Sequence, residues 1–546
     1  MISFRPIGYV IGLLVTALGR TMVIPLLADM FEGAATWSTF AFSAFFAIAF
    51  GISLILSCAD SITRGLTIQQ TFLLTTGCWL ALPIFGAVPF WVAPEPMGVS
   101  YTDAFFEAMS GLTTTGSTIY VDIEGLSLGL KLWRGMLQWF GGIGIIVMAM
   151  AFLPMLKVGG MQIFRSEGFD TFGKILPRAA EIAGAVSSIY LALTVMALLA
   201  YSWAGLSFID ALVHAMTTVA TGGYANYNDS FARVPAAAEY VAVVFMLLAS
   251  LPFVRYVQLL SGTARPLFQD SQIRVFFSIV GITVAGIALW QAVNTPGDLE
   301  FAFRKALFNT VSILTGTGYA SADYNTWGAF PVTTIFLIGL IGGCAGSTCC
   351  SIKVFRFQLL AAALVTQVRQ LHNPHGVFTP RYENRPVPED VISSVMAFFV
   401  LFVLTLAVVA ILLGLMGLST TTALSGAATA LANIGPGLGP RIGPTETFAS
   451  LPDAAKWVLA MTMLIGRLEL LSVYVLFSVR FWRGRARRPP ERAGPRPPGN
   501  GPPTRPFWPG GTGMRANRPG ARCTLGASGG DILGQKKAGA RCGEPG

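Results

Sequence analysis

The sequence contains four short turns rich in glycine and threonine, each preceded by an apolar segment too short to cross a bilayer. Backbone carbonyl and hydroxyl groups are ligands that can replace the water around a monovalent cation. Glycine reaches positive φ at little steric cost, which lets neighbouring peptide groups turn toward a common axis. The pattern predicts a cation filter formed by one chain, with turns at residues 113–117, 220–224, 315–319 and 433–437.

Aligning the turns places one glycine of each at an equivalent position, namely Gly116, Gly222, Gly318 and Gly435. A single such turn would be weak evidence, because membrane helices also use glycine for close packing. Four turns at comparable places favour a pore, with backbone carbonyls as the ion ligands. The expected filter residues are Thr114, Thr115, Gly116, Ala220, Thr221, Gly222, Thr317, Gly318, Asn433, Ile434 and Gly435.

The apolar segments before the turns are expected to be half-helices. Three of them begin with a residue suited to an N-cap, Asp103, Asp210 or Ser419. A half-helix that ends at the filter directs the negative end of its dipole, worth roughly half a charge, toward the ion. The expected half-helices are residues 103–112, 210–219, 300–314 and 419–431.

A continuous helix from Pro331 to about Leu364 would reach ~50 Å, whereas the hydrocarbon core is ~30 Å thick. We therefore expect a break at the glycine-rich stretch 342–348. Irregular backbone at that depth is tolerated only where it faces protein or a watery cavity, so this loop is a candidate gate below the filter. A glycine-rich packing face, or a helix that overhangs the cytoplasm, remains an alternative. The candidate gating residues are Gly342, Gly343, Gly346, Ser347, Thr348, Lys353 and Arg467.

Arg467 is expected near the middle of the last span, where an arginine costs roughly 3 kcal/mol and needs a partner. The carbonyl groups of the candidate gate and the hydroxyls of Ser347 and Thr348 could hold its guanidinium. Lys353 and Arg356 would then lie at the cytoplasmic mouth. A local ion pair with Glu469 is the alternative, although residues two apart lie on different helix faces.

Two further titratable residues occur in the half-helices. Glu107 could add negative potential near the filter or accept hydrogen bonds from backbone amides behind it. His214 has no second ligand at helical spacing, which favours a packed or hydrogen-bonded histidine. Cysteines 344, 349 and 350 have no histidine or carboxylate nearby, so packed thiols are favoured over a metal cluster.

The composition places these residues in a bilayer. Of the 546 residues, 53% are hydrophobic and only 12% are charged, whereas soluble domains average about 25% charged. Ten apolar stretches are long enough to span a membrane. They begin at Ile7, Trp37, Gln70, Lys131, Glu181, Glu239, Arg274, Pro331, Val391 and Ala455.

Basic residues alternate between the connections, which indicates which side each loop faces. Arg64, the basic residues of 157–178, Arg265 and those of 369–385 lie in every second connection, and such loops stay cytoplasmic. Both termini are then expected in the cytoplasm. This distribution explains the net charge of +10 without nucleic-acid binding.

The expected fold is an all-α integral membrane protein with two leading transmembrane helices and four pseudo-symmetric repeats of helix, pore loop and helix around a central pore. The tail is rich in Pro, Gly and Arg and is expected to be disordered. The expected divisions are a two-helix domain at 1–66, pore repeats at 67–160, 161–265, 266–370 and 371–483, and the tail at 484–546.

With these features together, the sequence resembles the Trk/Ktr/HKT superfamily of potassium transporters, and the two leading spans favour its TrkH branch over the shorter KtrB branch. Cysteines 349 and 350 depart from the glycine-rich continuation typical of the family, and the tail has no counterpart. The resemblance covers about residues 7–482 and is carried by the segments 141–146, 158–162, 315–320, 342–348, 352–354 and 433–436.

The resemblance implies potassium uptake across the bacterial inner membrane by a homodimer with one pore in each subunit. It also implies an intramembrane gating loop at 342–348, a gating arginine at Arg467, and a TrkA-like cytosolic ring that binds nucleotides and controls the gate. No covalently bound cofactor is expected. Glycine at Gly116, where some relatives have serine, fits the potassium-selective pattern of the family.

Other classes of membrane protein are weaker matches. An alternating-access transporter usually has ionisable residues at mid-membrane, and the filter segments carry none. A membrane enzyme is disfavoured, because no nucleophile with a base and no paired carboxylates occur at an intramembrane site. A sodium or mixed-cation channel of the same superfamily, or an ion-coupled potassium symporter, remains open.

Overall fold

The computed structural model describes residues 3–59, 66–151, 179–294 and 297–482. The basic loop and the 158–162 motif expected between the first two repeats, and the tail 484–546, lie outside the described residues. What is described is almost entirely helical, with one two-stranded antiparallel hairpin of β1 (Arg381–Tyr382) and β2 (Arg385–Pro386).

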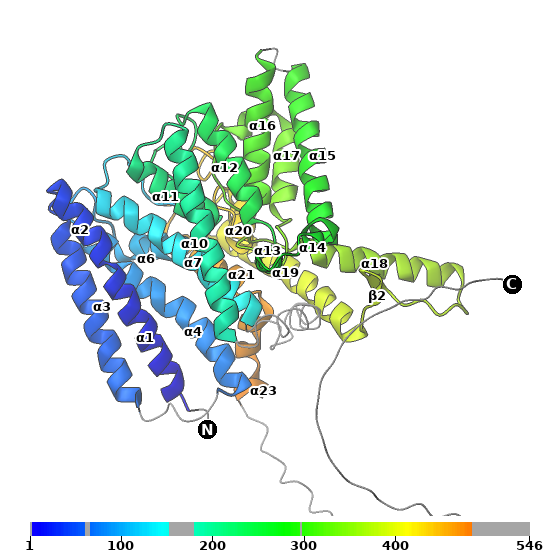
Figure 1. Ribbon diagram of the computed structural model, residues 1–546, viewed down its shortest axis with the longest axis horizontal. Helices are drawn as coiled ribbons and strands as arrows, with labels where there is room; N and C mark the ends of the chain where they lie inside the picture. The colour runs from blue at the N-terminus through cyan, green and yellow to red at the C-terminus, as the bar shows by residue number, and fades with distance from the viewer. Residues whose placement is uncertain (1–2, 60–65, 152–178, 295–296, 483–546) are drawn as a thin grey trace, which may run out of the picture. The chain divides into compact units, whose positions relative to one another are not determined.

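Three helices precede the repeated part of the chain, and the repeats follow one another along it (Figure 1). Helix α1 packs along α3, consistent with two leading spans. The leading and first-repeat helices are α1 (Arg5–Thr21), α2 (Val23–Glu32), α3 (Trp37–Cys58), α4 (Ile68–Gly86), α5 (Val88–Val92), α6 (Tyr101–Leu112) and α7 (Leu128–Ala151). The second repeat has α10 (Ala179–Trp203), α11 (Phe208–Val219), α12 (Ala236–Ala249), α13 (Phe253–Leu260) and α14 (Arg265–Gln269).

The third and fourth repeats complete the chain, and the third has the shortest second span, α17. The third has α15 (Ser271–Asn294), α16 (Leu299–Leu314), η2 (Tyr324–Trp327), α17 (Ala329–Gly339) and α18 (Val354–His372). The fourth has α19 (Glu389–Leu415), α20 (Thr420–Ala432), η3 (Phe448–Ser450), α21 (Asp453–Arg467), α22 (Leu471–Tyr474), η4 (Val475–Phe477) and α23 (Val479–Trp482).

The half-helices α6, α11, α16 and α20 each pack between a long helix before them and a helix after them. Each helix that follows a half-helix also packs against the half-helix of the next repeat. These contacts are α7 with α11, α12 with α16, α17 with α20, and α21 with α6. The last contact returns to the first repeat, so the four repeats form a closed ring.

Six described helices are long and apolar enough to cross a membrane, and eight spans result if two bent pairs are each counted as one. This is fewer than the ten stretches predicted from the sequence. The difference lies in two helices. Helix α7 is not among those long and apolar enough, and α17 has only 11 residues because its span is interrupted. The bent pairs turn by 87° between α12 and α13 and by 104° after α21.

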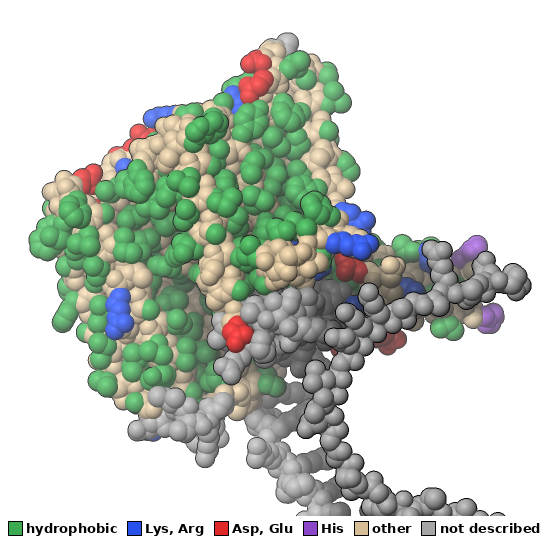
Figure 2. All heavy atoms as spheres, in the orientation of Figure 1, with side chains coloured by type: hydrophobic (Ala, Val, Ile, Leu, Met, Phe, Trp, Pro, Cys, Tyr) green, Lys and Arg blue, Asp and Glu red, His purple; other side chains and the backbone are tan. Residues whose placement is uncertain are grey.

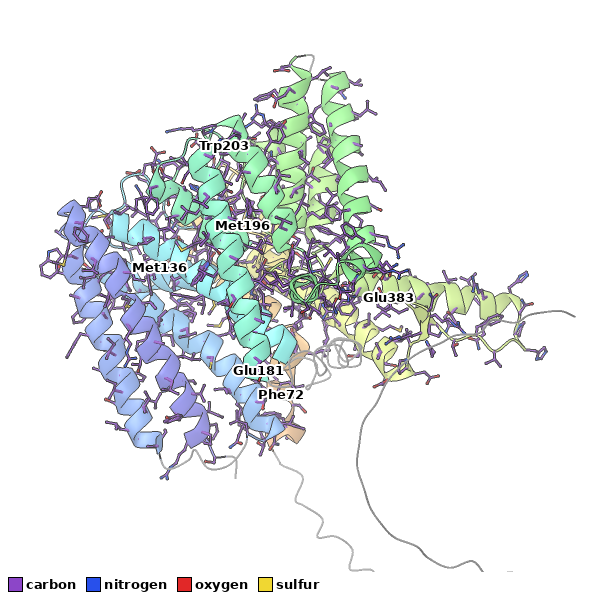
Figure 3. All side chains as sticks on the ribbon, viewed as in Figure 1. Phe72, Met136, Glu181, Met196, Trp203 and Glu383 are labelled. Carbon is purple, nitrogen blue, oxygen red and sulfur yellow. The ribbon has the colours of Figure 1, made fainter. Side chains whose placement is uncertain are left out.

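The surface suits a lipid environment. Hydrophobic side chains cover most of the bundle in Figure 2, with charged side chains few and mostly near its edges. Helix α10 shows the pattern, because Met196 and Trp203 point outward with 54% and 83% of their surface exposed, whereas Met136 of α7 is buried (Figure 3). A bilayer rather than water is the solvent for such a surface.

Candidate ion filter and gate

Each half-helix begins with a side-chain cap that fixes where its first turn starts. In α6 and α11 the caps are Ser100 and Ser207, whose hydroxyls accept hydrogen bonds from the amides of Asp103 and Asp210. The prediction that these aspartates begin the helices was wrong by three residues. The caps of α16 and α20 are Asp298 and Ser419. A serine with an acidic residue three positions later is a sequence signal that could have located the first two caps.

The four turns after the half-helices repeat the same backbone conformation. In each, two residues separated by one position have positive φ. The first of each pair is Thr114 (51°), Thr221 (49°), Gly316 (72°) or Asn433 (52°), and the second is Gly116 (87°), Gly223 (81°), Gly318 (83°) or Gly435 (115°).

This repeat corrects the alignment of the second turn. Gly223, not Gly222, occupies the position of Gly116, Gly318 and Gly435, and Gly222 has no positive φ. Ala220 therefore lies one position before the segment equivalent to Thr114 to Gly116, at the C-cap of α11. The tyrosines that directly follow Gly223 and Gly318 are a signal in the sequence that fixes the register.

The second glycines lie in a ring in which each repeat contacts the next. A β-carbon added to Gly116 would lie 2.4 Å from the carbonyl oxygen of Gly222. The corresponding distance from Gly223 to the oxygen of Thr317 is 1.9 Å. An added β-carbon would lie 1.9 Å from the Ile434 carbonyl oxygen at Gly318 and 2.9 Å from the Thr115 carbonyl oxygen at Gly435, which closes the ring. Side chains are therefore excluded at these positions.

Polar side chains brace the ring from behind. The Gln138 amide donates to the carbonyl of Gly222 over 2.5 Å and accepts from the amide of Tyr224 over 3.0 Å. Asn433 Nδ2 donates to Thr115 Oγ1 over 2.9 Å, which joins the fourth turn to the first. Ser117 Oγ donates to the carbonyl of Gly435 over 2.8 Å. Sequence reasoning did not identify the roles of Gln138 and Ser117, because both contacts join residues more than 80 positions apart.

Glu107 lies behind the first turn, where it is fully buried and paired with Arg134 over 2.8 Å. The carboxylate also accepts from the amide of Ile119 over 2.9 Å and from Thr118 Oγ1 over 3.1 Å. Arg134 donates to the carbonyl of Ala225 over 3.0 Å, so the pair links the first two turns. Of the two roles considered for Glu107, its contacts match hydrogen bonding to backbone behind the filter, with the addition of an arginine that the sequence did not single out.

Replacing Glu107 with glutamine is expected to lower the free energy of unfolding by about 3–5 kcal/mol, because Arg134 would keep a buried charge without a counter-ion. Thermal unfolding of the detergent-purified protein measures this. The matched control is Glu124→Gln, since Glu124 is an exposed partner of Arg233. Equal unfolding temperatures for the two variants would contradict a structural role for the buried pair.

His214 is fully buried in α11, and its Nδ1 lies 2.7 Å from the carbonyl oxygen of Asp210 one helical turn earlier. Its ring stacks on Tyr227 with 5.7 Å between centroids. These contacts are those of a packed, hydrogen-bonded histidine.

The long span of the third repeat is broken, as its length predicted: α17 ends at Gly339 and α18 begins at Val354. The loop between them packs against the break between α12 and α13. The amide of Cys344 donates to the carbonyl of Ser250 over 3.1 Å, and the amide of Phe253 donates to the carbonyl of Gly346 over 3.0 Å. Backbone groups that lack helical partners thus satisfy one another inside the bundle.

The end of this loop lies against the filter turns. Cys350 Sγ is 3.5 Å from Thr114 Oγ1, and a β-carbon on Gly316 would lie 3.4 Å from the Cys350 β-carbon. The carbonyl of Cys350 approaches Gly342 so closely that a β-carbon there would lie 1.9 Å away. The loop therefore folds back on itself, with Cys350 against the first and third turns.

Arg467 is the last residue of α21, at a sharp bend, rather than near the middle of a continuous span as predicted. Leu468 follows, and the two residues after it, Glu469 and Leu470, have positive φ of 62° and 38°. Positive φ in non-glycine residues costs free energy that the surrounding contacts must offset. Apolar residues 468 and 470–471 gave no sequence signal for this bend.

The Arg467 guanidinium is buried and bridges the loop to α7. Nη1 donates to Cys350 Sγ over 2.5 Å and to the carbonyl of Thr348 over 3.4 Å, and Nη2 donates to the carbonyl of Gly141 over 3.4 Å. The guanidinium also lies 5.9 Å from the ring centroid of Trp79.

The prediction that a carbonyl of the loop holds this arginine is confirmed by the contact with Thr348, whereas the other predicted partners were wrong. The hydroxyls of Ser347 and Thr348 donate instead to the carbonyls of Cys344 and Ala249. Neither hydroxyl bonds to Arg467. Glu469, the alternative partner, forms an ion pair with Arg356. Arg356 is fully buried rather than at an open mouth, and Lys353 donates to the carbonyl of Cys349.

Two cavities are lined by residues of the ring and its neighbours. One is lined by all four positive-φ glycines, Gly116, Gly223, Gly318 and Gly435. The other is lined by Asn433 together with loop and bend residues that include Cys350, Lys353 and Arg467. A ring of backbone carbonyls is the kind of arrangement that can replace the water around a monovalent cation.

Comparison with known proteins identifies the family of the chain. Residues 38–485 match the family model TrkH, described as cation transport protein. The chain is 44% identical over 493 residues to the Trk system potassium uptake protein TrkI of Halomonas elongata, covering 88% of this chain and 97% of that protein. It is 34% identical over 489 residues to the Trk system potassium uptake protein TrkH of Escherichia coli K12, covering 88% and 99%.

A solved structure shows the same fold. The crystal structure of the potassium transporter TrkH from Vibrio parahaemolyticus superimposes with a TM-score of 0.81 at 32% identity. The match covers 88% of this chain and 100% of the Vibrio chain.

Proposed function

This chain belongs to the TrkH family of cation transport proteins, and from that premise we propose that it takes up potassium through a pore formed by its four repeats. The relatives it matches over almost their whole length are named as potassium uptake proteins. The observation that supports the proposal most directly is the closed ring of four positive-φ glycines. We infer transport without catalysis, with potassium as cargo and no bound cofactor.

The filter we propose is formed by the corrected positions. It comprises backbone of Thr114, Thr115 and Gly116 in the first turn, with carbonyl oxygens as potassium ligands. The other turns contribute residues 221–223, 316–318 and 433–435. The half-helices end at these turns, so their dipoles favour a cation there.

We propose that the loop 340–353 is the gate and that Arg467 holds it shut. The loop end contacts the first and third filter turns through Cys350. Arg467 holds that same cysteine and the Thr348 carbonyl, and Lys353 holds the Cys349 carbonyl. Gly342, Gly343, Gly346, Ser347 and Thr348 make up the fold of the loop itself.

A cytosolic nucleotide-binding subunit and a homodimeric assembly complete the proposed system, in the bacterial inner membrane with both chain ends in the cytoplasm. Helix α18 begins one residue after Lys353, so a force on this helix would act directly on the loop. It extends away from the bundle in Figure 1 and exposes apolar residues to a partner. These are Leu364, Val365, Val368 and Leu371.

Potassium and sodium flux into liposomes tests the function, with the wild type beside Gly116→Ser. We expect potassium or rubidium flux to exceed sodium flux in the wild type. The preference is expected to fall in the variant, because its β-carbon would lie 2.4 Å from the Gly222 carbonyl. Equal sodium and potassium flux in the wild type would indicate a mixed-cation channel instead.

A proton or sodium gradient that drives uptake would indicate a coupled symporter. If neither the wild type nor Gly116→Ser conducts, the same assay on a variant with a shortened gate loop distinguishes a closed gate from an incorrect filter assignment.

A further inference from the structure

A large apolar cavity lies beside the proposed gate and outside the proposed pore. It has a volume of about 540 Å³, within the range of about 300–1,000 Å³ that is usual for small-molecule sites. Its walls come from α1, α4, α7 and α10. Helices α1, α4 and α10 are among the candidate membrane spans, which places the cavity within the bilayer.

The lining offers no free hydroxyl donor to a ligand. Thr21, Thr75 and Ser187 line the cavity, but each donates to a carbonyl one turn earlier in its own helix, over 2.7, 2.9 and 2.7 Å. The remaining wall is formed mostly by aliphatic and aromatic side chains, among them Leu14 and Leu74. Such a lining favours an apolar ligand, because a buried polar group would find few partners there.

The glycine motif of α7 shapes the inner wall. A β-carbon on Gly141 would lie 1.9 Å from the Leu112 carbonyl oxygen, so this glycine is needed for packing. At Gly144, in contrast, the nearest neighbour of an added β-carbon is Trp79 at 3.6 Å, an ordinary van der Waals contact. Gly144 thus leaves open space that packing does not require.

We propose that this cavity binds an acyl chain of a bilayer phospholipid. Its inner wall is formed by Trp79 and Gly141, the same residues that contact the guanidinium of Arg467. An acyl chain in the cavity would therefore touch the residues that position the proposed gate arginine. The proposed lipid site does not depend on the proposed function. Only the link between the site and the gate rests on the proposed function.

Photo-cross-linking tests the site in the full-length protein, reconstituted in liposomes that contain a phospholipid with a diazirine in its acyl chain. After irradiation, mass spectrometry is expected to find lipid adducts on residues 74–82 of α4 and 140–148 of α7. Gly144→Leu and Leu14→Trp, which fill the cavity from opposite walls, are expected to reduce these adducts at least several-fold.

The matched control is Leu13→Trp, because Leu13 is exposed on α1 but does not line the cavity. Adducts on the lipid-facing Phe45 of α3, which is 73% exposed, report insertion in every variant. Wild-type protein labelled on α3 but not on α4 or α7 would overturn the proposal. Equal labelling of α4 and α7 in all variants would overturn it as well. Neither readout requires ion flux, so a failure of the proposed function leaves this test interpretable.

Discussion

Replacing Gly223 with alanine is expected to reduce potassium flux by more than tenfold. The substitution forces a side chain onto a residue with φ of 81° and places its β-carbon 1.9 Å from the carbonyl oxygen of Thr317. The unfavourable φ alone costs about 1–3 kcal/mol, and about 1.4 kcal/mol corresponds to a factor of ten. Because the clash is with backbone of the neighbouring repeat, it can be relieved only by opening the ring. Rubidium uptake into liposomes measures the loss.

Gly222→Ala is the matched control for this prediction. A β-carbon there would meet the side chain of Gln138, with 2.4 Å to its nearest atoms, and a flexible side chain can move aside. The expected loss of flux is smaller than at Gly223, although the two hydrogen bonds of Gln138 would be weakened. If Gly222→Ala were the more damaging change, the equivalence of Gly222 with Gly116 would be restored and the corrected register would be wrong.

Replacing Arg467 with alanine is expected to raise basal flux about tenfold or more when no regulatory subunit is present. The change removes the bonds to Cys350 and to the Thr348 carbonyl, which together tie the loop end to α21. Hydrogen bonds from charged groups contribute about 1.5–3 kcal/mol each, so the closed loop would lose a large part of its stabilisation. The measurement is rubidium uptake by purified protein in liposomes.

Arg233→Ala serves as the control, because the Arg233 side chain is 62% exposed and its ion pairs are with Glu124 and Asp229, outside the loop. Deletion of residues 343–346 is a second variant that shortens the loop itself and is also expected to raise basal flux. Basal flux that stays at the wild-type level in both variants, with filter selectivity intact, would remove the loop from the mechanism.

The sequence predicted the architecture well because the bilayer limits what an apolar segment can be. Segments of about 20 apolar residues must be spans, and shorter ones before a glycine turn must return to the same side. The half-helices were accordingly located to within three residues at their starts, and their ends to within one. The interruption between α17 and α18 followed from length alone.

The site was less predictable where two neighbouring residues fit the same pattern. Gly222 and Gly223 both supply a glycine after Thr221, and the only difference visible in the sequence is the tyrosine that follows Gly223, as one follows Gly318. Their φ angles distinguish them in the structure. The bend after Arg467 depends on tertiary contacts at residues with no glycine or proline. The contact of Arg467 with Cys350 joins residues 117 positions apart and has no local signature.

Because the four turns of the proposed filter are encoded separately in one chain, a single codon change alters only a quarter of the ring. A pore of four identical subunits would receive the same change four times and would often lose conduction altogether. Here Asn433 already stands where the other turns have Thr114, Thr221 or Gly316. Ion preference can therefore drift in small steps along a lineage, one quarter at a time, while the other three keep the pore open.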